Sequence, residues 1–310
     1  MARPRIAITL GDPAGIGPEI ALKAALDERV TSICEPVLVG AKGVLDFHSR
    51  ICGISIKKTR ILETAEEPFS IGNIEAAHGR AALAAAKRAI DAALGHEVDA
   101  VVAAPQTELA VKRAGIEFDG YPSFVARCTG VAPEDAFLML CFDATRIVHV
   151  TLHVSLRRAI ELVTRERVGK AIRAAAATLR RLAIKEPKIA VSGLNPHAGE
   201  EGLFGDEEMR IISPAISDAV ADSLAVDGPI GADILFNRKG YDAYVVMIHD
   251  QGHIVAKTQA THRTAGLTIG TPVLFSSVAH GSALDIAGQN RASPEAVIEA
   301  VRRLAGFGQT

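Results

Sequence analysis

The sequence predicts a parallel α/β protein, and two observations carry that prediction. Short apolar runs rich in β-branched residues recur along the 310-residue chain, and longer alanine-rich segments separate them. This alternation is typical of strands joined by helices that cover a sheet. The expected strands are Arg5–Leu10, Pro36–Gly40, Asp99–Pro105, Ile147–His153, Lys188–Asn195, Tyr241–Asp250 and Val273–His280.

Two long helices are expected between these strands. Glu75–Gly95 consists of strong helix formers with a glycine at the expected stop, and Arg165–Leu182 repeats apolar residues at helical spacing. No internal repeat, low-complexity stretch or obvious linker interrupts the chain. If the chain forms two lobes, we therefore expect it to cross between them more than once.

The composition excludes several classes of protein. Apolar residues make up 48% and charged residues 23% of the chain, as in an ordinary soluble globular protein. The net charge of −2 provides no basic field for a nucleic acid. No apolar segment approaches the roughly 18 residues that span a bilayer, and the four scattered cysteines argue against a zinc ribbon or a disulfide framework. We expect a cytoplasmic protein with neither a nucleic-acid nor a membrane partner.

Three histidines stand near the ends of expected strands, where open parallel sheets bind ligands. These are His153, His197 and His249. Three imidazoles brought together would suit a divalent ion such as zinc and would leave positions open for the oxygens of a substrate. Their long separations in the sequence leave ordinary structural roles open. Rival candidates are His149, His253 and His280, although His149 and His153 would lie about 13 Å apart along one strand, too far to share an ion.

Two glycine-containing segments are candidates for contact with a ligand. Gly11–Glu19 (GDPAGIGPE) follows a strand and opens a helix. It lacks the spacing of a dinucleotide fingerprint and the Lys-Ser/Thr of a P-loop, so a tight structural turn is the alternative to a phosphate contact. In Ala279–Gly288 (AHGSALDIAG), small residues surround His280 and Asp285. They would let the backbone approach a flat polar ligand, and the alternative is a turn at the entry of a helix.

The motifs together resemble one family. HGSALDIAG at His280–Gly288 resembles the NAD-contacting loop of the isocitrate and isopropylmalate dehydrogenase fold. The chain also contains GDPAGIGPE at Gly11–Glu19, NPHAGE at Asn195–Glu200, GADILF at Gly231–Phe236 and YDAYVVMIHDQG at Tyr241–Gly252. This set is similar to the 4-hydroxythreonine-4-phosphate dehydrogenase family, a branch of that fold.

The resemblance implies an architecture and an assembly. The fold would consist of two α/β/α lobes with the active site in the cleft between them. Residues 1–123 and 276–310 would form the lobe on the cofactor side, and residues 124–275 the lobe for metal, substrate and dimerisation. The family also implies a homodimer whose subunits share each active site.

The resemblance also implies roles for individual residues. The divalent ion, zinc by preference, would be held by His153, His197 and His249, with His249 reaching in from the partner subunit. Lys257 would bind the substrate or move a proton, and Asp250 and Asp233 would be bases or would orient a histidine. NAD, or alternatively NADP, would contact His280, Gly281, Ser282, Asp285 and Gly288.

Departures from the family pattern point to the substrate. Tyr121-Pro122 stands where the phosphate-handling members have His-Thr, and Gly266 and Phe275 stand where they have a substrate-binding Asn and Arg. Neither glycine nor a phenyl ring can replace the charge-assisted bonds of an arginine, so a phosphomonoester is a poor candidate substrate. The expected substrate-binding positions are Tyr121, Pro122, Ser123, Lys257, Gly266 and Phe275.

The strings Gly120–Ser123, Arg146–His153, His249–Ile254 and Ser276–Val278 instead resemble a subgroup that oxidises the dihydrodiol made from terephthalate. The expected reaction is oxidation of a β-hydroxy acid and loss of CO2, which would yield protocatechuate. The alternatives are 4-hydroxythreonine 4-phosphate, as in pyridoxal phosphate biosynthesis, or a related four-carbon sugar-acid phosphate. More remote alternatives are a metal-dependent hydrolase and a non-catalytic solute-binding protein.

Overall fold

The computed structural model describes residues 3–260 and 264–306, and within these ranges the chain divides into two compact units. Unit 1 contains residues 3–130 and 272–306, and unit 2 contains residues 131–260 and 264–271. The resemblance implied boundaries between the lobes after residues 123 and 275, and the two units meet after residues 130 and 271. Residues 1–2 and 307–310, at the ends of the expected cofactor-side lobe, lie outside the described residues.

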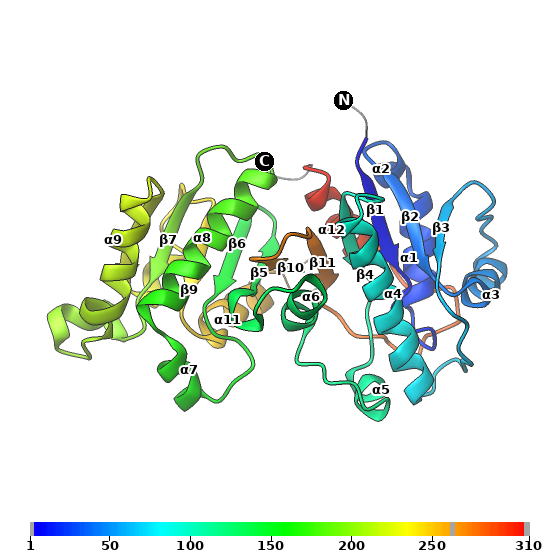
Figure 1. Cartoon of the computed structure of the whole chain (residues 1–310), viewed down its shortest axis with the longest axis horizontal. Helices are drawn as coiled ribbons and strands as arrows, with labels where there is room; N and C mark the ends of the chain where they lie inside the picture. Colours follow the sequence, from blue (N-terminus) through cyan, green and yellow to red (C-terminus); the bar gives the residue numbers. More distant parts are fainter. Residues whose placement is uncertain (1–2, 261–263, 307–310) are drawn as a thin grey trace. The chain divides into compact units, whose positions relative to one another are not determined.

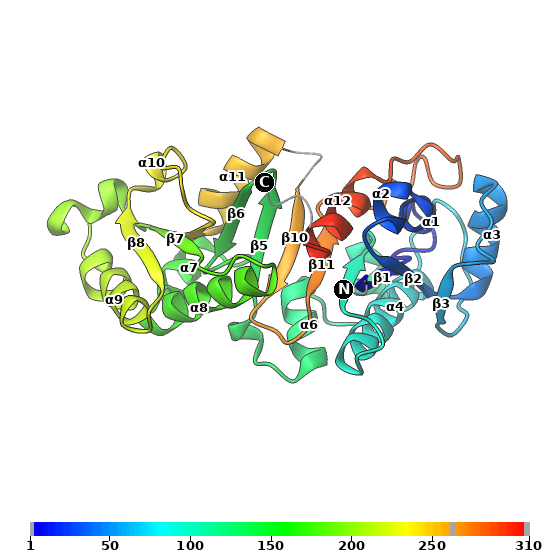
Figure 2. The same ribbon diagram turned by 90° about the horizontal axis from the view of Figure 1, so that it is seen from above.

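Unit 1 is built on a parallel sheet of strand order β3-β2-β1-β4-β11. Helices α1 and α12 contact each other and the sheet, whereas α4 packs on β1, β2 and β4; Figure 2 shows these two sets on opposite faces. The strands are β1 Arg5–Thr9, β2 Glu35–Gly40, β3 Arg60–Glu63, β4 Ala100–Ala103 and β11 Phe275–Val278. The helices are α1 Gly17–Leu26, α2 Glu28–Thr31, α3 Lys42–Cys52, α4 Ala76–Leu94, α5 Glu108–Arg113, α6 Tyr121–Thr129 and α12 Glu295–Leu304.

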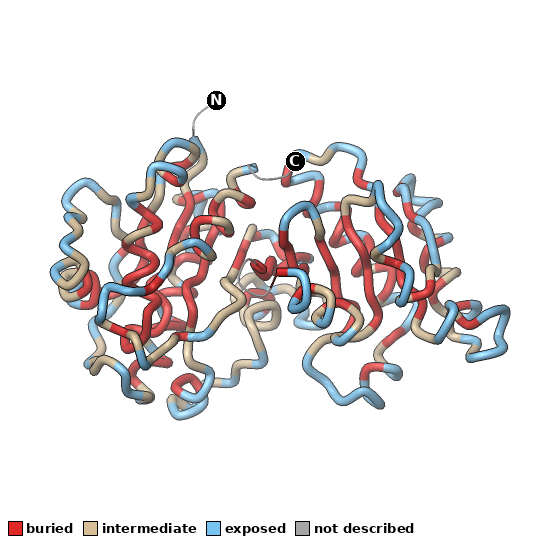
Figure 3. The backbone as a smooth tube through the Cα atoms, turned by 180° about the vertical axis from the view of Figure 1, so that it is seen from behind, coloured by how far each residue is buried: buried red, intermediate tan, exposed pale blue. Residues whose placement is uncertain are grey.

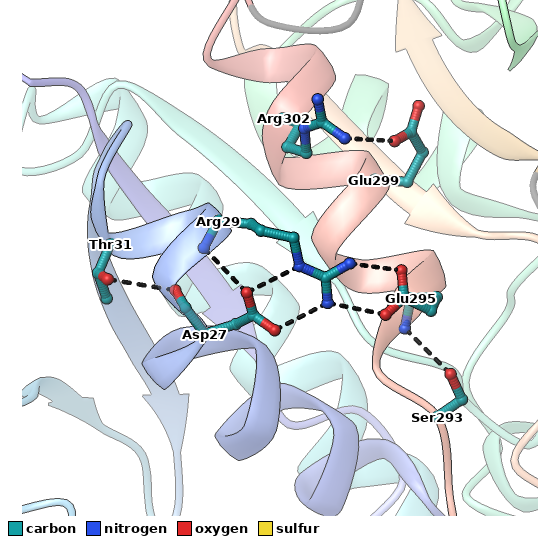
Figure 4. Close-up of polar contacts among 7 residues, drawn as sticks. All are labelled: Asp27, Arg29, Thr31, Ser293, Glu295, Glu299 and Arg302. Carbon is teal, nitrogen blue, oxygen red and sulfur yellow. Dashed lines mark hydrogen bonds and ion pairs between the residues drawn. The ribbon is translucent and has the colours of Figure 1, made fainter.

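One arginine links α2 to the start of the C-terminal helix α12 within unit 1. The guanidinium of Arg29 donates to both carboxylate oxygens of Asp27, at 2.9 and 2.8 Å, and to both of Glu295, at 2.9 and 2.7 Å (Figure 4). The hydrogen bonds from Arg29 lower the pKa of the Asp27 carboxyl. Because Glu295 is the first residue of α12, this fork sets where that helix begins against α2.

Unit 2 has a mixed sheet of strand order β10-β5-β6-β9-β7-β8 (Figure 1). Its strands β10 and β5, and β5 and β6, pair antiparallel, while the remaining pairs are parallel. The parallel pairing expected from the sequence is present in three of the five strand pairs of this unit, and the two pairs of β5 are antiparallel. The strands are β5 Phe137–Phe142, β6 Thr145–His149, β7 Lys188–Ser192, β8 Ala225–Ile230, β9 Ala243–Val246 and β10 Ala265–Ile269.

Helices cover both faces of the second sheet, with α8 on one face and α11 on the other (Figure 2). The strands of each unit are largely buried (Figure 3). Both long helices predicted from the sequence are confirmed, as α4 and α8. The α-helices of unit 2 are α7 Leu156–Leu162, α8 Arg165–Arg181, α9 Ser213–Ala221, α10 Ala232–Leu235 and α11 His249–Ala260. Shorter helical turns are η1 Pro133–Asp135, η2 Pro196–Gly202 and η3 Glu208–Ile212.

Three predicted strand ends in unit 2 lie beyond the observed strands, which end at His149, Ser192 and Val246, and two of them affect histidines. The strand β6 ends at His149, so His153 lies in the following turn rather than on the strand. The strand β9 ends at Val246, and His249 is the first residue of α11. In both cases the apolar run continues past the ladder, because the residues directly after each strand, Val150 and Thr151 after β6 and Met247 after β9, are buried.

The remaining bulk properties are simple. None of the described helices is long and apolar enough to cross a membrane. The four cysteines are free thiols, with Cys34 and Cys141 buried and Cys52 and Cys128 half-buried. The expectation of cysteines without disulfides is confirmed.

Candidate functional site

Two imidazoles lie together on unit 2. His153 follows β6, and His249 begins α11 next to the end of β9. The centroids of their rings are 5.7 Å apart. Both rings line a cavity of about 420 Å³, together with Leu152, Val154, Ser155, Leu156, Ala159, Ile248 and Asp250.

The spacing of His153 and His249 fits a shared divalent ion. A Zn–N bond of about 2.1 Å places an imidazole centroid about 3.2 Å from the ion, so two imidazoles on one tetrahedral ion have centroids about 5.2 Å apart. The Nδ1 of His249 lies 2.6 Å from Oδ1 of Asp250. Because a carboxylate only accepts, this Nδ1 carries the proton and Nε2 keeps the lone pair that a metal requires. The donor set therefore fits the ion that the resemblance implies.

His197 lies apart from this pair. Its side chain is 65% exposed, its Nδ1 is 3.0 Å from Oε2 of Glu200, and its ring packs edge-on against Phe204. Across the described residues, no group of three or more His, Cys, Asp or Glu side chains is arranged to hold a metal. One chain thus brings together two of the three histidines predicted from the sequence.

A buried carboxylate holds the NPHAGE segment that carries His197. Glu208 is 3% exposed, and its Oε1 accepts from the backbone N–H groups of Leu194 and Asn195, both at 2.7 Å. Its Oε2 accepts from the side-chain amide of Asn195 at 2.9 Å. Burial alone would raise the pKa of this carboxyl, but these hydrogen bonds lower it below its ordinary value of 4.5. Glu208 lies outside every motif in the sequence, and no spacing signal could have found it.

Two further histidines lie behind His249. His149 is 1% exposed, and its Nε2 is 3.1 Å from Nδ1 of His253. The ring of His253 in turn stacks on that of His249, with centroids 3.7 Å apart and planes 9° from parallel. Burial is the main cause that lowers the pKa of His149 to about 3 and that of His253 to about 4. Both rings are therefore neutral at pH 7.

The other candidates on unit 2 are Asp233 on α10 and Lys257 on α11. Asp233 is in the first turn of α10, and a Cβ added to Gly231 would lie 2.7 Å from its Oδ1. The same Cβ would lie 3.7 Å from the Cα of His197. Lys257 is exposed in the last turn of α11. Asp233 therefore lies near His197, whereas Lys257 shares a helix with His249.

On unit 1, the expected cofactor loop is tied to the ends of β1 and β4. The hydroxyl of Thr107 hydrogen-bonds both Oδ2 of Asp12 and, at 2.9 Å, the hydroxyl of Ser282. A carboxylate cannot donate and a hydroxyl has one proton, so Thr107 donates to Asp12 and Ser282 donates to Thr107. Asp12 and Ser282 are 1% and 6% exposed. This relay fixes the loop that contains Ser282 on the turn that contains Asp12.

The glycines of GDPAGIGPE allow this close packing. A Cβ on Gly15 would lie 2.6 Å from the carbonyl oxygen of Ser282, and one on Gly17 would lie 2.2 Å from that of Leu10. Gly11 has a positive φ of 64°, and a Cβ at this position would lie 2.2 Å from the carbonyl oxygen of Pro105. The observed contacts of these glycines are with protein backbone, which favours the structural turn over a direct phosphate contact.

The remaining residues of the expected cofactor loop are more open than Ser282. Gly281 and Asp285 are exposed, and His280 is half-buried with Nδ1 3.1 Å from the carbonyl of Gly281. Gly288 has a positive φ of 72°. The exposed backbone of Gly281, next to the buried Ser282, would let a flat ligand approach the loop closely.

The expected substrate positions of unit 1 form an aromatic group. Tyr121 begins α6, followed by Pro122 and Ser123, and its ring centroid is 4.9 Å from that of Phe275 on β11. Phe275 is 1% exposed, and the hydroxyl of Tyr121 is buried without a hydrogen-bond partner among the described residues. On unit 2, Gly266 is buried on β10 opposite Leu140 of β5. None of these side chains carries a positive charge.

Comparison with known proteins shows the relationship directly. The family model described as pyridoxal phosphate biosynthetic protein PdxA matches residues 32–304. The chain is 43% identical to a 1,2-dihydroxy-3,5-cyclohexadiene-1,4-dicarboxylate dehydrogenase from Comamonas sp, over 97% of this chain and 96% of that one. It is 40% identical to a protein from Symbiobacterium thermophilum provisionally named D-threonate 4-phosphate dehydrogenase, over 97% and 95% of the two chains. A terephthalate 1,2-cis-dihydrodiol dehydrogenase from Burkholderia xenovorans LB400 has a similar structure, with a TM-score of 0.77, 39% identity and 98% of each chain covered.

These similarities first define a class: an α/β dehydrogenase with the isocitrate and isopropylmalate dehydrogenase-like fold, as the sequence predicted. More narrowly, the chain belongs to the PdxA family. It is an oxidoreductase of the kind that acts on a CH–OH group.

Proposed function

We propose that this chain is a metal- and NAD-dependent dehydrogenase that oxidises a cis-dihydrodiol dicarboxylate of the terephthalate type and removes a carboxylate as CO2, giving protocatechuate. The observation that carries the proposal is the lack of a positively charged side chain at Tyr121, Gly266 and Phe275. A buried phenyl ring packed on a tyrosine and a glycine on a strand offer nothing to a phosphate dianion. The identity to the Comamonas dehydrogenase supports the same substrate class.

The residues of unit 2 suit the reacting end of such a substrate. When bound, the divalent ion would supply Lewis acidity to the reacting hydroxyl and to the charge that develops on decarboxylation. Asp250 keeps the proton on Nδ1 of His249, so that Nε2 faces the ion. Lys257 orients a substrate carboxylate, and Asp233 orients His197 or receives a proton.

The residues of unit 1 suit the cofactor. His280, Gly281, Asp285 and Gly288 offer an open loop to NAD, with NADP as the alternative, and Ser282 anchors that loop from below. The cofactor supplies the hydride acceptor, and the protein supplies placement and electrostatics.

The active enzyme in this proposal is a homodimer that shares its metal site. The reason is that His153 and His249 meet within one chain whereas His197 does not join them, so that the second subunit would contribute His197 rather than His249, which the resemblance implied. Unit 2 also exposes most of the large apolar side chains that are exposed in the described residues, as a dimer surface would require. These are Val154, Leu156, Ile160, Leu203, Phe204, Met209, Val220, Ile234 and Ile254.

Subunit mixing tests the shared site. Neither His153→Ala nor His197→Ala should oxidise the diol alone, but mixed dimers would contain one intact site if His197 crosses between subunits. Mixing equal amounts should then restore about a quarter of wild-type activity, since half of the dimers would be mixed and each would have one working site. No recovery in verified mixed dimers would refute the crossing of His197 between subunits.

Substrate preference tests the proposed reaction. NAD reduction is measured with the terephthalate cis-dihydrodiol, 4-hydroxythreonine 4-phosphate and D-threonate 4-phosphate. The phosphate esters are the second candidate substrates, because the Symbiobacterium relative is almost as similar to this chain. Loss of two charge-assisted bonds, each about 1.5–3 kcal/mol, predicts a kcat/KM at least about 100-fold higher for the diol. A preference for either phosphate ester would overturn the proposed substrate.

A further inference from the structure

The hydrogen bonds of His149 determine which of its nitrogens carries the proton. Its Nδ1 faces the carbonyl oxygen of Leu138, at 3.4 Å, across the antiparallel pairing of β5 and β6. A carbonyl only accepts, so Nδ1 of His149 donates. Its Nε2 is an acceptor, because the Nδ1 of His253 that faces it also faces the carbonyl oxygen of His249 and must donate.

The neighbours of His253 likewise determine which of its nitrogens carries a proton. Its Nδ1 lies 3.1 Å from the accepting Nε2 of His149 and 3.3 Å from the carbonyl oxygen of His249. Both neighbours accept, so Nδ1 of His253 must donate. The ring of His253 is held at that nitrogen, and its plane lies against His249 with 9° between the planes.

The stack separates the role of His253 from that of a metal ligand. Its centroid is 3.7 Å from that of His249, whereas two imidazoles on one tetrahedral ion would have centroids about 5.2 Å apart. His153, at 5.7 Å, meets that spacing. His253 therefore lies behind the ring of His249 instead of beside it on the ion.

Gly252 makes the arrangement sterically possible. A Cβ at this position would lie 2.3 Å from Nε2 of His149 and 2.7 Å from the side chain of Ile147. Only a residue without a side chain lets His149 reach beneath α11 to His253. The string Gly252-His253 and the distant His149 thus form one structural unit.

We propose that His149 and His253 are positioning residues that hold the ring of His249 in the orientation in which its Nε2 takes up the metal ion. The inference rests on the metal site of the proposed function. Asp250 fixes the proton on His249 from one edge, and the stack with His253 fixes the plane of the ring. Outer groups of this kind typically change metal affinity by about 10–100-fold.

Zinc affinity of the metal-free full-length protein tests the inference without turnover. Competition with a chromophoric chelator should show about 10–100-fold weaker zinc binding for His253→Ala. His253→Phe, which keeps an aromatic ring but loses the N–H, should bind with an affinity between those of His253→Ala and wild type. Substitution of the exposed His96 by alanine is the matched control and should bind zinc as wild type does. Zinc binding by His253→Ala within about twofold of wild type would overturn the inference.

A second measurement uses the wild type alone and does not depend on a variant folding. Nitrogen-15 NMR of the histidine side chains should show His149 and His253 both protonated at Nδ1. A proton on Nε2 of His253 would overturn the inference even if zinc binds normally. A wild type that fails to bind zinc would instead refute the metal site of the proposed function, and the inference with it.

Discussion

The relay from Ser282 through Thr107 to Asp12 makes a quantitative prediction for Thr107→Val. Valine has nearly the shape of threonine, so the substitution removes the hydroxyl without opening a cavity. It leaves Oδ2 of Asp12 and the hydroxyl of Ser282 without their shared partner, at positions that are 1% and 6% exposed. A bond to a charged acceptor contributes about 1.5–3 kcal/mol and a neutral one about 0.5–1.5 kcal/mol. We therefore expect the free energy of unfolding of unit 1 to fall by about 2–4 kcal/mol.

The assay has a stability arm and a binding arm. Urea unfolding followed by far-UV circular dichroism suits a chain without tryptophan, and the two units are fitted separately if two transitions appear. Calorimetric titration with NAD should show weaker binding, because the loop that contains Ser282 loses its tether. Thr107→Ser, which keeps the hydroxyl, is the matched control and should remain close to wild type in both measurements.

Two results for Thr107→Val would contradict these expectations. If Thr107→Val lowers the stability by less than about 0.5 kcal/mol, the buried hydroxyls do not form the relay inferred here. If stability falls but NAD affinity is unchanged, the relay is structural and the loop at residues 280–288 does not bind the cofactor.

Three further substitutions test buried polar groups. Glu208→Gln should lower the stability of unit 2 at pH 7, since a glutamine oxygen could still accept from the two backbone N–H groups but its NH2 group could not accept from the side-chain amide of Asn195; because the native pKa of Glu208 is lowered, this loss should shrink in urea unfolding as the pH falls below the ordinary value of 4.5. His48→Leu should raise stability by about 1–2 kcal/mol, because this buried ring has no hydrogen-bond partner among the described residues. Burial lowers the native pKa of His48, so the unfolded chain takes up its proton first, and the gain should grow as the pH falls below 6.5. Glu19→Leu should cost about 3 kcal/mol in the same assay, because it strips the fully buried partner from Lys23.

Each of these three predictions has a contrary result. A stability difference for Glu208→Gln that is the same at pH 5 and pH 3 would contradict the lowered pKa. A gain for His48→Leu that is equal at pH 5 and pH 8 would mean that the native ring titrates normally. An unchanged midpoint for Glu19→Leu would mean that the ion pair with Lys23 is not needed to hold α1.

Periodicity predicted the elements that have one solvated face or a clear stop. Helix α4 was found because alanine-rich helix formers run unbroken to Gly95, and α8 because its apolar residues recur at helical spacing. Strand β5 was missed because Phe137–Phe142 is apolar throughout, and such a run fits a strand or a buried helix equally well. Its antiparallel pairing with β6 and β10 depends on tertiary packing that local sequence does not encode.

The candidate site was predictable only where a motif carries it. His153 and His249 were found because each lies in a recognisable string, although both were assigned to strand ends that the structure places elsewhere. The prediction that His149 and His153 are too far apart to share an ion assumed one continuous strand, and that assumption was wrong because β6 ends at His149. The contact between His149 and His253 joins residues 104 positions apart, and no spacing rule connects them.

The glycines of the motifs have structural roles within the protein. Gly15 and Gly252 both belong to strings that resemble a family with a known chemistry, yet each is explained by one close contact within the protein, with Ser282 and with His149. Removing a Cβ at each position lets a polar side chain reach a neighbour that it could not otherwise touch. A glycine in a functional motif can therefore contribute indirectly, because it leaves space for a side chain that positions a metal ligand or a cofactor loop. For this chain, the substitutions that change metal and cofactor affinity should then include residues such as Thr107 and His253, which the motif alone would not have selected.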